Sequence, residues 1–193
     1  MTDDREATSD ETLCRRIAAR DDAAFDVLVT RHQARAYRLA WSLLRNAEDA
    51  RDVSQEAFIR VWQAAHRFRG DARFSTWFYR ILVNACLDYK RRGRWWRRVI
   101  ARDAEHQADD EPLIARQPAP GPDPGDDVIA AQTMERLWRA VHRLSPQQRA
   151  AVILYGQEHL SMAEIADVLG LAEPTVRVHL HRAVAALRKE LAP

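Results

Sequence analysis

The chain is poor in the features that mark β-rich, metal-binding and membrane proteins. Gly accounts for only 6 of the 193 residues, so the turns that a many-stranded sandwich or barrel needs are scarce. The two cysteines, Cys14 and Cys86, lie far apart and outside any Cys-x-x-Cys pair, which argues against a zinc site and a disulfide framework. No stretch approaches ~18 consecutive apolar residues, and the first residues are polar and mostly acidic, unlike a secretory signal. We therefore expect a cytoplasmic protein without membrane insertion.

Charge is distributed unevenly, although the net charge is only +2. Residues 60–102 are rich in Arg and Lys, and the stretch that follows is acidic and rich in proline. Proline removes backbone donors and disfavours a helical conformation in the residue before it, and this stretch offers few side chains to bury. We expect a flexible linker at residues 99–126, between one domain at residues 9–98 and a second at residues 127–191.

Apolar residues recur at helical spacing in both domains, which predicts an all-α fold. The expected helices cover residues 23–44, 47–68 and 127–144, and a further helix runs from near Ser75 to the Arg91-Arg92-Gly93 stretch. Asp21 is suited to cap the first of these helices. Ser145 followed by Pro146 predicts the start of another helix, because serine caps well and proline fits the first helical position.

Residues 160–183 have the pattern of a helix-turn-helix. Ser161 and Glu164 form a capping-box pattern that opens a short helix, and Gly170 permits the sharp turn after it. The side chains expected to fill the core shared by the two helices are Ile165, Leu169, Val176 and Leu180. The side chains expected to face a major groove are Arg177, Val178, His179, His181 and Arg182. Arginine can bind O6 and N7 of guanine with two hydrogen bonds, so the motif predicts binding to DNA.

Residues 68–98 interleave basic and aromatic side chains. Arg and Lys neutralise phosphates, and aromatic rings stack on unpaired bases at ~1–3 kcal/mol per base, so this composition suits a single strand of DNA. We assign Phe78 and Ile81 to packing and leave Trp77 open. The run of residues 94–98, which contains Trp95 and Trp96, has three open roles: gripping the DNA backbone, covering the end of the domain, or lying on a membrane surface.

These segments together resemble the extracytoplasmic-function sigma factors of the sigma-70 family. Residues 160–183 are similar to the family's region 4.2, and residues 49–62 are similar to its region 2.2. Residues 68–81 look like region 2.3, and Asn84 with residues 88–91 looks like region 2.4. The blocks follow one another in the family's order, across a similar linker. The pattern departs from the family at Val178, His179 and Val184, which puts the preferred −35 sequence in doubt.

The resemblance implies a division of labour along the chain. It implies that Asp49, Asp52, Gln55 and Glu56 dock on the β′ clamp helices of RNA polymerase core. It implies that the −10 promoter element is contacted by Phe68, Arg73, Trp77, Asn84, Lys90 and Arg91. It implies that the −35 element is contacted by Thr175, Arg177, Val178, His179, His181 and Arg182. It further implies contact with the β flap, control by an anti-sigma factor, and no need for a metal or another cofactor.

Two other classes of protein remain to be weighed. The helix-turn-helix also resembles the LuxR-type module of autonomous transcriptional regulators, but no signature of a sensing domain precedes it. A carboxylate metal enzyme would draw on residues such as Glu48 and Asp52, yet the matched Glu-x-x-His motifs that such bundles use are missing. No nucleophile elbow or phosphate-binding glycine loop occurs either, so we do not expect catalysis.

Overall fold

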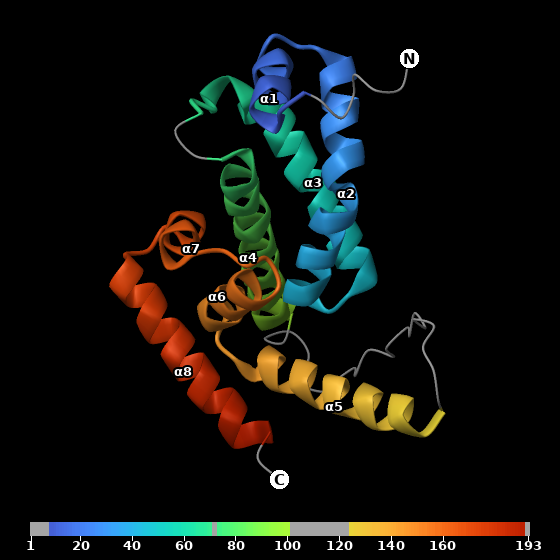
Figure 1. Cartoon of the computed structure of the whole chain (residues 1–193), viewed down its shortest axis with the longest axis vertical. Helices are drawn as coiled ribbons and strands as arrows, with labels where there is room; N and C mark the ends of the chain where they lie inside the picture. The colour runs from blue at the N-terminus through green and yellow to red at the C-terminus, as the bar shows by residue number, and fades with distance from the viewer. Residues whose placement is uncertain (1–7, 71–72, 101–123, 192–193) are drawn as a thin grey trace.

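The computed structural model describes residues 8–70, 73–100 and 124–191, and side chains within residues 8–70, 73–91 and 132–191. The helices are α1 (Asp10–Ala18), α2 (Asp22–Leu44), α3 (Ala47–Ala64), the short 3-10 helix η1 (Ala65–Arg67), α4 (Phe74–Ile100), α5 (Pro124–Arg143), α6 (Pro146–Gly156), α7 (Met162–Leu169) and α8 (Glu173–Leu191) (Figure 1). The described ranges contain no strand, and the all-α prediction is confirmed. No helix among them is long and apolar enough to cross a membrane.

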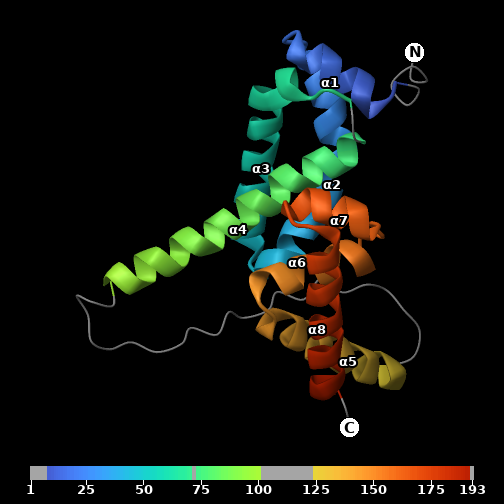
Figure 2. The same cartoon turned by 90° about the vertical axis from the view of Figure 1, so that its left-hand side faces the viewer.

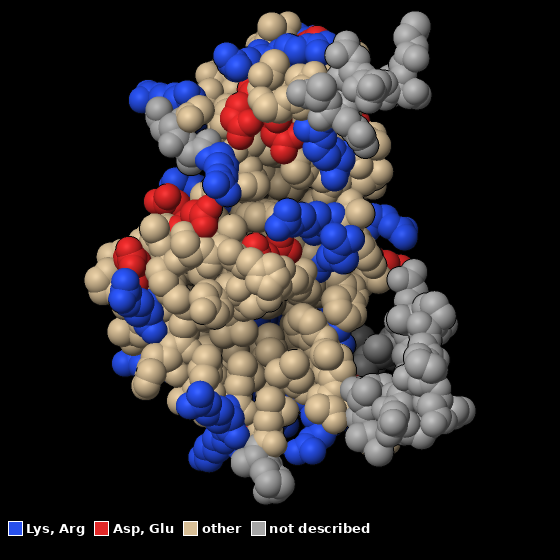
Figure 3. All heavy atoms as spheres, in the orientation of Figure 1, with Lys and Arg blue, Asp and Glu red and all other residues tan. Residues whose placement is uncertain are grey.

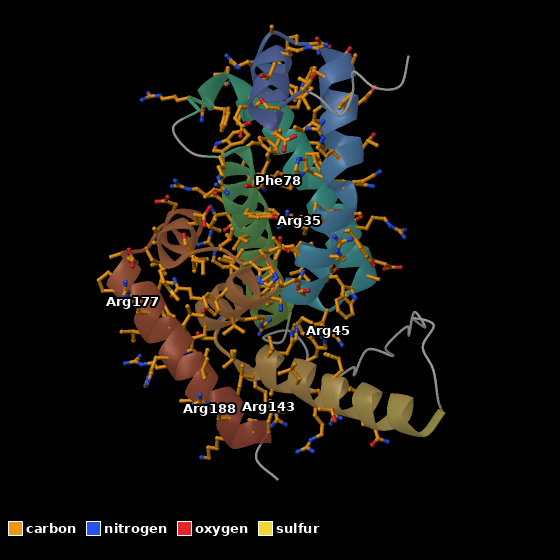
Figure 4. All side chains as sticks on the ribbon, in the orientation of Figure 1. Arg35, Arg45, Phe78, Arg143, Arg177 and Arg188 are labelled. Atoms are coloured by element: carbon orange, nitrogen blue, oxygen red, sulfur yellow. The ribbon has the colours of Figure 1, made fainter. Side chains whose placement is uncertain are left out.

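The N-terminal bundle consists of α1–α4 with η1, and aromatic rings form much of its core. Phe78 of α4 is fully buried and stacks on Phe58 of α3 and on Phe74, with ring centroids 5.1 and 5.8 Å apart (Figure 4). The packing role assigned to Phe78 is therefore confirmed.

Asp21 caps α2 as predicted, because its side chain accepts a hydrogen bond from the backbone N–H of Ala24.

The C-terminal bundle consists of α5–α8, and its local signals agree with the sequence. Ser145 and Ser161 both form capping boxes, the second with Glu164. Gly170 ends α7 in the left-handed region with φ of 65°, where a side chain would be strained. Ile165 and Val176 are fully buried between α7 and α8. The helix-turn-helix prediction is confirmed at these positions.

Several predictions about the helices differ from the structure. The helix α1 was not predicted, because its nine residues are too few to show a clear apolar period. The helix α4 does not end at Gly93 but continues to Ile100, since a single glycine costs a helix only ~1 kcal/mol. The helix α5 begins at Pro124 rather than residue 127, and the first helical turn tolerates proline. The predicted linker falls mostly on residues 101–123, which lie outside the described residues.

The two bundles are packed against each other. The helix α7 lies against α4, and α6 lies against α2, which Figures 1 and 2 show from two directions. Buried apolar residues of both bundles belong to one continuous core cluster, for example Val83 of α4 and Ile165 of α7. Segments separated in sequence by the undescribed stretch therefore form one packed body.

We predict that Gly170→Ala lowers the free energy of unfolding by about 1 kcal/mol, because alanine is strained at the left-handed φ of 65°. A Cβ at this position would meet nothing within 4 Å, so the cost is conformational and not steric. Gly156→Ala is the matched control. Its Cβ would also meet nothing within 4 Å, but the residue is helical, and we expect a gain of about 0.5 kcal/mol. Urea unfolding followed by circular dichroism measures both; equal effects would contradict the conformational explanation.

Candidate nucleic-acid interface

The predicted polymerase-binding residues lie on the outward side of α3. The opposite side of this helix is buried, with Ala50, Val53 and Ala57 in the core. Asp52, Gln55 and Glu56 are exposed, as a spacing of three and four residues on one helical face requires. Glu56 pairs with Arg60 at 3.0 Å, an exposed ion pair one turn along the helix. The structure thus brings these three side chains together on one acidic surface.

Ile59 belongs to the same outward face of α3, which sequence reasoning missed. It follows Gln55 and Glu56 by four and three residues and is 50% exposed. Although it is apolar, it lies off the buried stripe of Val53, Ala57 and Val61. An exposed isoleucine among carboxylates suits a partner that is basic and partly apolar. The signal that could have found it is this offset from the buried stripe.

Asp49, the fourth of the predicted polymerase-binding residues, is turned toward α4. Its Oδ1 accepts a hydrogen bond of 2.6 Å from the hydroxyl of Tyr89, and Asp49 is half-buried. The hydrogen bond to Asp49, with a smaller contribution from burial, raises the pKa of Tyr89 to about 12. The phenol therefore stays protonated and remains a donor at neutral pH. Sequence reasoning did not single out Tyr89, because a tyrosine beside a basic run is equally expected to stack on DNA.

Phe68 and Trp77 form an aromatic pair at the start of α4. Their ring centroids lie 5.2 Å apart at 51°, and Phe68 also meets Phe74 edge-on at 6.2 Å. Both Phe68 and Trp77 are half-buried, so part of each ring packs against the core and part is open to solvent. Arg73 is exposed and directly precedes α4. Its carbonyl accepts a hydrogen bond from the backbone N–H of Trp77. Two aromatic surfaces and an exposed basic residue therefore lie at this end of α4.

Trp77, Asn84 and Arg91 form a row along one side of α4. Their spacing of seven residues returns each to nearly the same face of a helix. Asn84 and Arg91 are exposed, and Arg91 pairs with Asp88 at 2.9 Å. Lys90 is half-buried on the neighbouring face. The row thus offers an aromatic ring, an amide and a guanidinium in line along the helix.

The predicted recognition face of α8 is largely open to solvent. Thr175, Arg177, Val178, His181 and Arg182 are exposed, and Figure 4 shows Arg177 near the N-terminal end of α8. Arg177 donates a hydrogen bond of 2.5 Å to Glu173, one turn earlier in the helix. Both side chains of this ion pair are partly exposed. This exposed pair contributes under ~1 kcal/mol, so Arg177 can exchange its partner for a base at small cost.

His179 is less available than predicted. It is half-buried, and its Nδ1 is enclosed without a hydrogen-bond partner. The residue lies between the exposed face and the stripe of Val176, Leu180 and Ala183 that packs on α6 and α7. Only part of its imidazole can reach a groove. The run of residues 94–98 lies in α4, but its side chains lie outside the described residues, so its three open roles stay undecided.

Positive charge gathers around the later turns of α8. Figure 3 shows basic side chains at this end of the molecule and a broad area without charge between them and the upper bundle. Arg182, Arg188 and Lys189 are exposed on α8. Cations on a helix that enters DNA neutralise phosphates on either side of the groove. The charge distribution of α8 therefore suits duplex DNA.

We predict a coupling free energy of about 1 kcal/mol between Tyr89 and Asp49, the usual contribution of one hydrogen bond. The measurement is a double-mutant cycle in urea unfolding, with Tyr89→Phe, Asp49→Asn and both together. The Tyr89→Phe and Asp52→Asn pair is the control, because Asp52 accepts no hydrogen bond from Tyr89, and there the two effects should add. Additive effects in the Tyr89–Asp49 cycle would show that the contact does not form in solution.

Comparison with protein families places both bundles in one family. Residues 28–97 match the model of Sigma-70 region 2, and residues 134–187 match the model of Sigma-70, region 4. The first match contains α3 and the row on α4, and the second contains the helix-turn-helix. Each of the three candidate surfaces therefore falls within a matched region.

Curated relatives cover nearly the whole chain. The ECF RNA polymerase sigma factor SigM of Mycobacterium tuberculosis H37Rv is 36% identical over 187 residues, which is 97% of this chain and 87% of the relative. The RNA polymerase sigma-H factor of Pseudomonas aeruginosa is 34% identical over 187 residues, or 95% of this chain and 94% of the relative. Because the similarity runs through both bundles, it favours a sigma factor over a LuxR-type regulator.

Solved structures agree with this assignment. CnrH, solved in complex with the cytosolic domain of CnrY, matches with a TM-score of 0.66 and 25% identity, over 95% of this chain and 97% of CnrH. The sigma factor RpoE of Bartonella quintana, solved with the anti-sigma factor NepR, has the same fold at a TM-score of 0.65, with 22% identity over 86% of this chain and 96% of RpoE. The chain belongs to the extracytoplasmic-function sigma factors of the sigma-70 family.

Proposed function

We propose that the chain binds RNA polymerase core through α3, contacts the −10 element through α4 and reads the −35 element through α8. The observation that carries this proposal is the separation of three chemically distinct, solvent-facing surfaces on three helices. One is acidic with an exposed isoleucine, one is aromatic and basic, and one is the exposed face of a helix-turn-helix. Each chemistry suits a different target, and all three are required for promoter-directed initiation.

The acidic face of α3 is assigned to the β′ clamp helices. Asp52 and Glu56 supply charge for a basic partner, Gln55 supplies a donor and an acceptor, and Ile59 supplies apolar contact. Charged residues at the rim of such an interface steer the encounter, while a partly buried apolar residue contributes most to the lifetime of the complex. Ile59 is therefore added to the predicted set.

The Phe68–Trp77 pair and the row on α4 are assigned to the −10 element. Unpaired bases stack on aromatic rings, and an extruded base must be held by a shaped pocket that offsets the loss of stacking. Asn84 lies about two helical turns beyond Trp77, and its amide can hydrogen-bond the edge of such a base. Arg73 and Arg91 lie at either side to neutralise phosphates.

The exposed face of α8 is assigned to the −35 element. Arg177 and Arg182 are suited to guanine or phosphate, and the methyl groups of Val178 are suited to the methyl group of thymine. Contact with the β flap is assigned to the same bundle, where Met134 of α5 and Tyr155 of α6 are 52% and 53% exposed. Exposed apolar side chains on adjacent helices are a usual feature of protein-binding surfaces.

The remaining assignments rest on the family. We propose a cytoplasmic, non-catalytic protein whose functional domains span residues 9–98 and 127–191. We also propose control by an anti-sigma factor, because the relatives CnrH and RpoE were each solved in a complex, RpoE with a protein named as its anti-sigma factor. Co-purification from cells grown under several stresses tests this; recovery of polymerase alone under every condition would count against it.

We predict that Asp52→Lys weakens binding to RNA polymerase core by tenfold or more, that is by at least ~1.4 kcal/mol, because it places like charge against a basic partner. Binding to labelled core is measured by fluorescence anisotropy, and promoter-dependent transcription follows in the same samples. Asp26→Lys is the control, since Asp26 is also exposed but lies on α2. Equal losses of affinity in the two variants would show that α3 does not belong to the polymerase interface.

We predict that Arg177→Ala weakens binding of the holoenzyme to promoter DNA by ~1–3 kcal/mol and relaxes the preference at one −35 position. Start sites mapped on genomic DNA with core and wild-type protein define the −35 sequence, and competition binding with each single-base variant measures the preference. Arg139→Ala, at an exposed position on α5, should change neither quantity. A uniform loss across all variants would assign Arg177 to phosphate and not to a base.

A further inference from the structure

The first backbone N–H group of α4 needs an acceptor from outside the helix. The N–H groups of Thr76 and Trp77 donate to the carbonyl of Arg73 at 3.1 and 3.2 Å, but that of Phe74 has no carbonyl within its own turn to bind. Arg73, directly before the helix, cannot cap it with its side chain, because a guanidinium has only donors. The first turn of α4 also contains no acidic residue.

Glu11 of α1 supplies the missing acceptor from 63 residues earlier in the chain. Its Oε1 accepts a hydrogen bond of 3.2 Å from the backbone N–H of Phe74. This hydrogen bond, with a further one from the backbone N–H of Glu11, lowers the pKa of Glu11, so the side chain is a carboxylate at neutral pH. A negative charge is favourable at the N-terminus of a helix. Glu11 therefore acts as the cap of α4.

The residue that Glu11 holds contacts both aromatic rings assigned to the −10 element. Phe74 is fully buried, and its ring centroid lies 6.2 Å from that of Phe68 and 6.0 Å from that of Trp77. Because protein interiors are close-packed, a shift of Phe74 must displace the rings that pack against it. The position of the Phe68–Trp77 pair thus depends on how firmly the start of α4 is held.

The first turn of α1 is itself anchored to α2. Asp10, next to Glu11, pairs with Arg31, and its Oδ2 lies 2.8 Å from Nε2 of His32. The ring of His32 in turn lies against that of Phe74, with centroids 5.2 Å apart. Phe74 is therefore held through its backbone by Glu11 and through its ring by a residue that Asp10 binds.

The helix α1 also packs on the segment that precedes Phe68. The short helix η1 ends one residue before Phe68, and α1 lies against it (Figure 1). Leu13 and Ile17 of α1 and Ala65 of η1 are all buried. The helix α1 thus contacts the elements on both sides of residues 68–73, which carry two of the predicted −10 contacts.

We propose that Glu11 is a positioning residue for the −10 contact: it fixes the start of α4 and so holds the rings of Phe68 and Trp77 in place for an unpaired base. Glu11 acts through Phe74 and not by touching DNA. A preformed site binds more tightly than one that binding must first order, because ordering opposes association. The inference rests on the proposed assignment of α4 to the −10 element and extends it to α1.

The test uses a fluorescently labelled single strand of DNA, the non-template strand across the −10 element of a mapped start site. Its binding to holoenzyme, assembled from core and each variant, is measured by anisotropy against a strand with a scrambled −10 element. We expect Glu11→Ala to weaken binding by about fivefold, because binding must then order the start of α4 without its cap. The affinities for core and for a −35 duplex should stay unchanged.

Glu11→Gln separates the hydrogen bond from the size of the side chain. The amide keeps an acceptor oxygen and loses only the charge. We expect this variant to lose no more than about twofold in strand affinity, because the interaction of one partly exposed charge with a helix dipole is small. A loss as large as that of Glu11→Ala would contradict a role for the hydrogen bond to Phe74.

The matched control is Asp21→Ala, which removes a carboxylate cap from another helix of the same bundle. Asp21 accepts from the backbone N–H of Ala24 at 3.0 Å, and like Glu11 it is half-buried. Its loss should leave the strand affinity unchanged, and circular dichroism establishes that both variants keep their helices. Equal losses of strand affinity in Asp21→Ala and Glu11→Ala would assign the effect to the stability of the bundle and overturn the proposal.

Hydrogen exchange in the free chain tests the contact without polymerase. The amide of Phe74, followed by NMR, should exchange faster in Glu11→Ala and at the wild-type rate in Asp21→Ala. Unchanged exchange in Glu11→Ala would show that the cap does not form. Faster exchange with full strand affinity would reject the positioning role and leave the proposed function standing. A wild-type holoenzyme that does not distinguish the −10 strand from the scrambled one would reject the proposed −10 contact, and this inference with it.

Discussion

The periodicity of α4 is the constraint on which the rest of this structure depends. One side of the helix carries Phe78 into the aromatic core, and a second carries Tyr79 to a hydrogen bond with Glu158 of the C-terminal bundle. A third side leaves Asn84 and Arg91 open to solvent in line with Trp77. Because successive residues of a helix are rotated by about 100°, these three sets cannot exchange places without losing the others. The aromatic core, the contact between the bundles and the solvent-facing row are therefore fixed by one register.

The contact between the bundles is rich in charge, which sets it apart from the two cores. Apolar packing joins the bundles, but Arg35, Arg149 and Glu158 decide how they fit, since each has a hydrogen-bond partner in the opposite bundle. Buried ion pairs add little net stability compared with apolar side chains, yet they strongly penalise misfit. Charged and hydrogen-bonding groups of this kind are also solvated readily by water.

The sequence predicted the local structure well wherever a short-range signal existed. The caps at Asp21 and Ser161 and the turn at Gly170 depend on residues within a few positions of one another, and all three appear in the structure. The continuation of α4 beyond Gly93 was missed because the stability that the many other residues give to the helix outweighs the modest free-energy cost of one glycine. The exposure of Ile59 was missed for a related reason: the burial of a residue depends on what packs against its face, not on its hydrophobicity.

The sequence by itself determined the all-α class, the helix-turn-helix and most of the residues on the outward faces of α3 and α8. These follow from spacing within single helices and from motifs that resemble one family. Only the tertiary structure decided that Tyr89 bonds to Asp49, that His179 is half enclosed, and that Glu158 meets Arg35 and Tyr79. Such contacts join residues that are tens of positions or more apart, and no local pattern encodes them. They arise because a buried polar atom must find a partner wherever the folded chain brings one within reach.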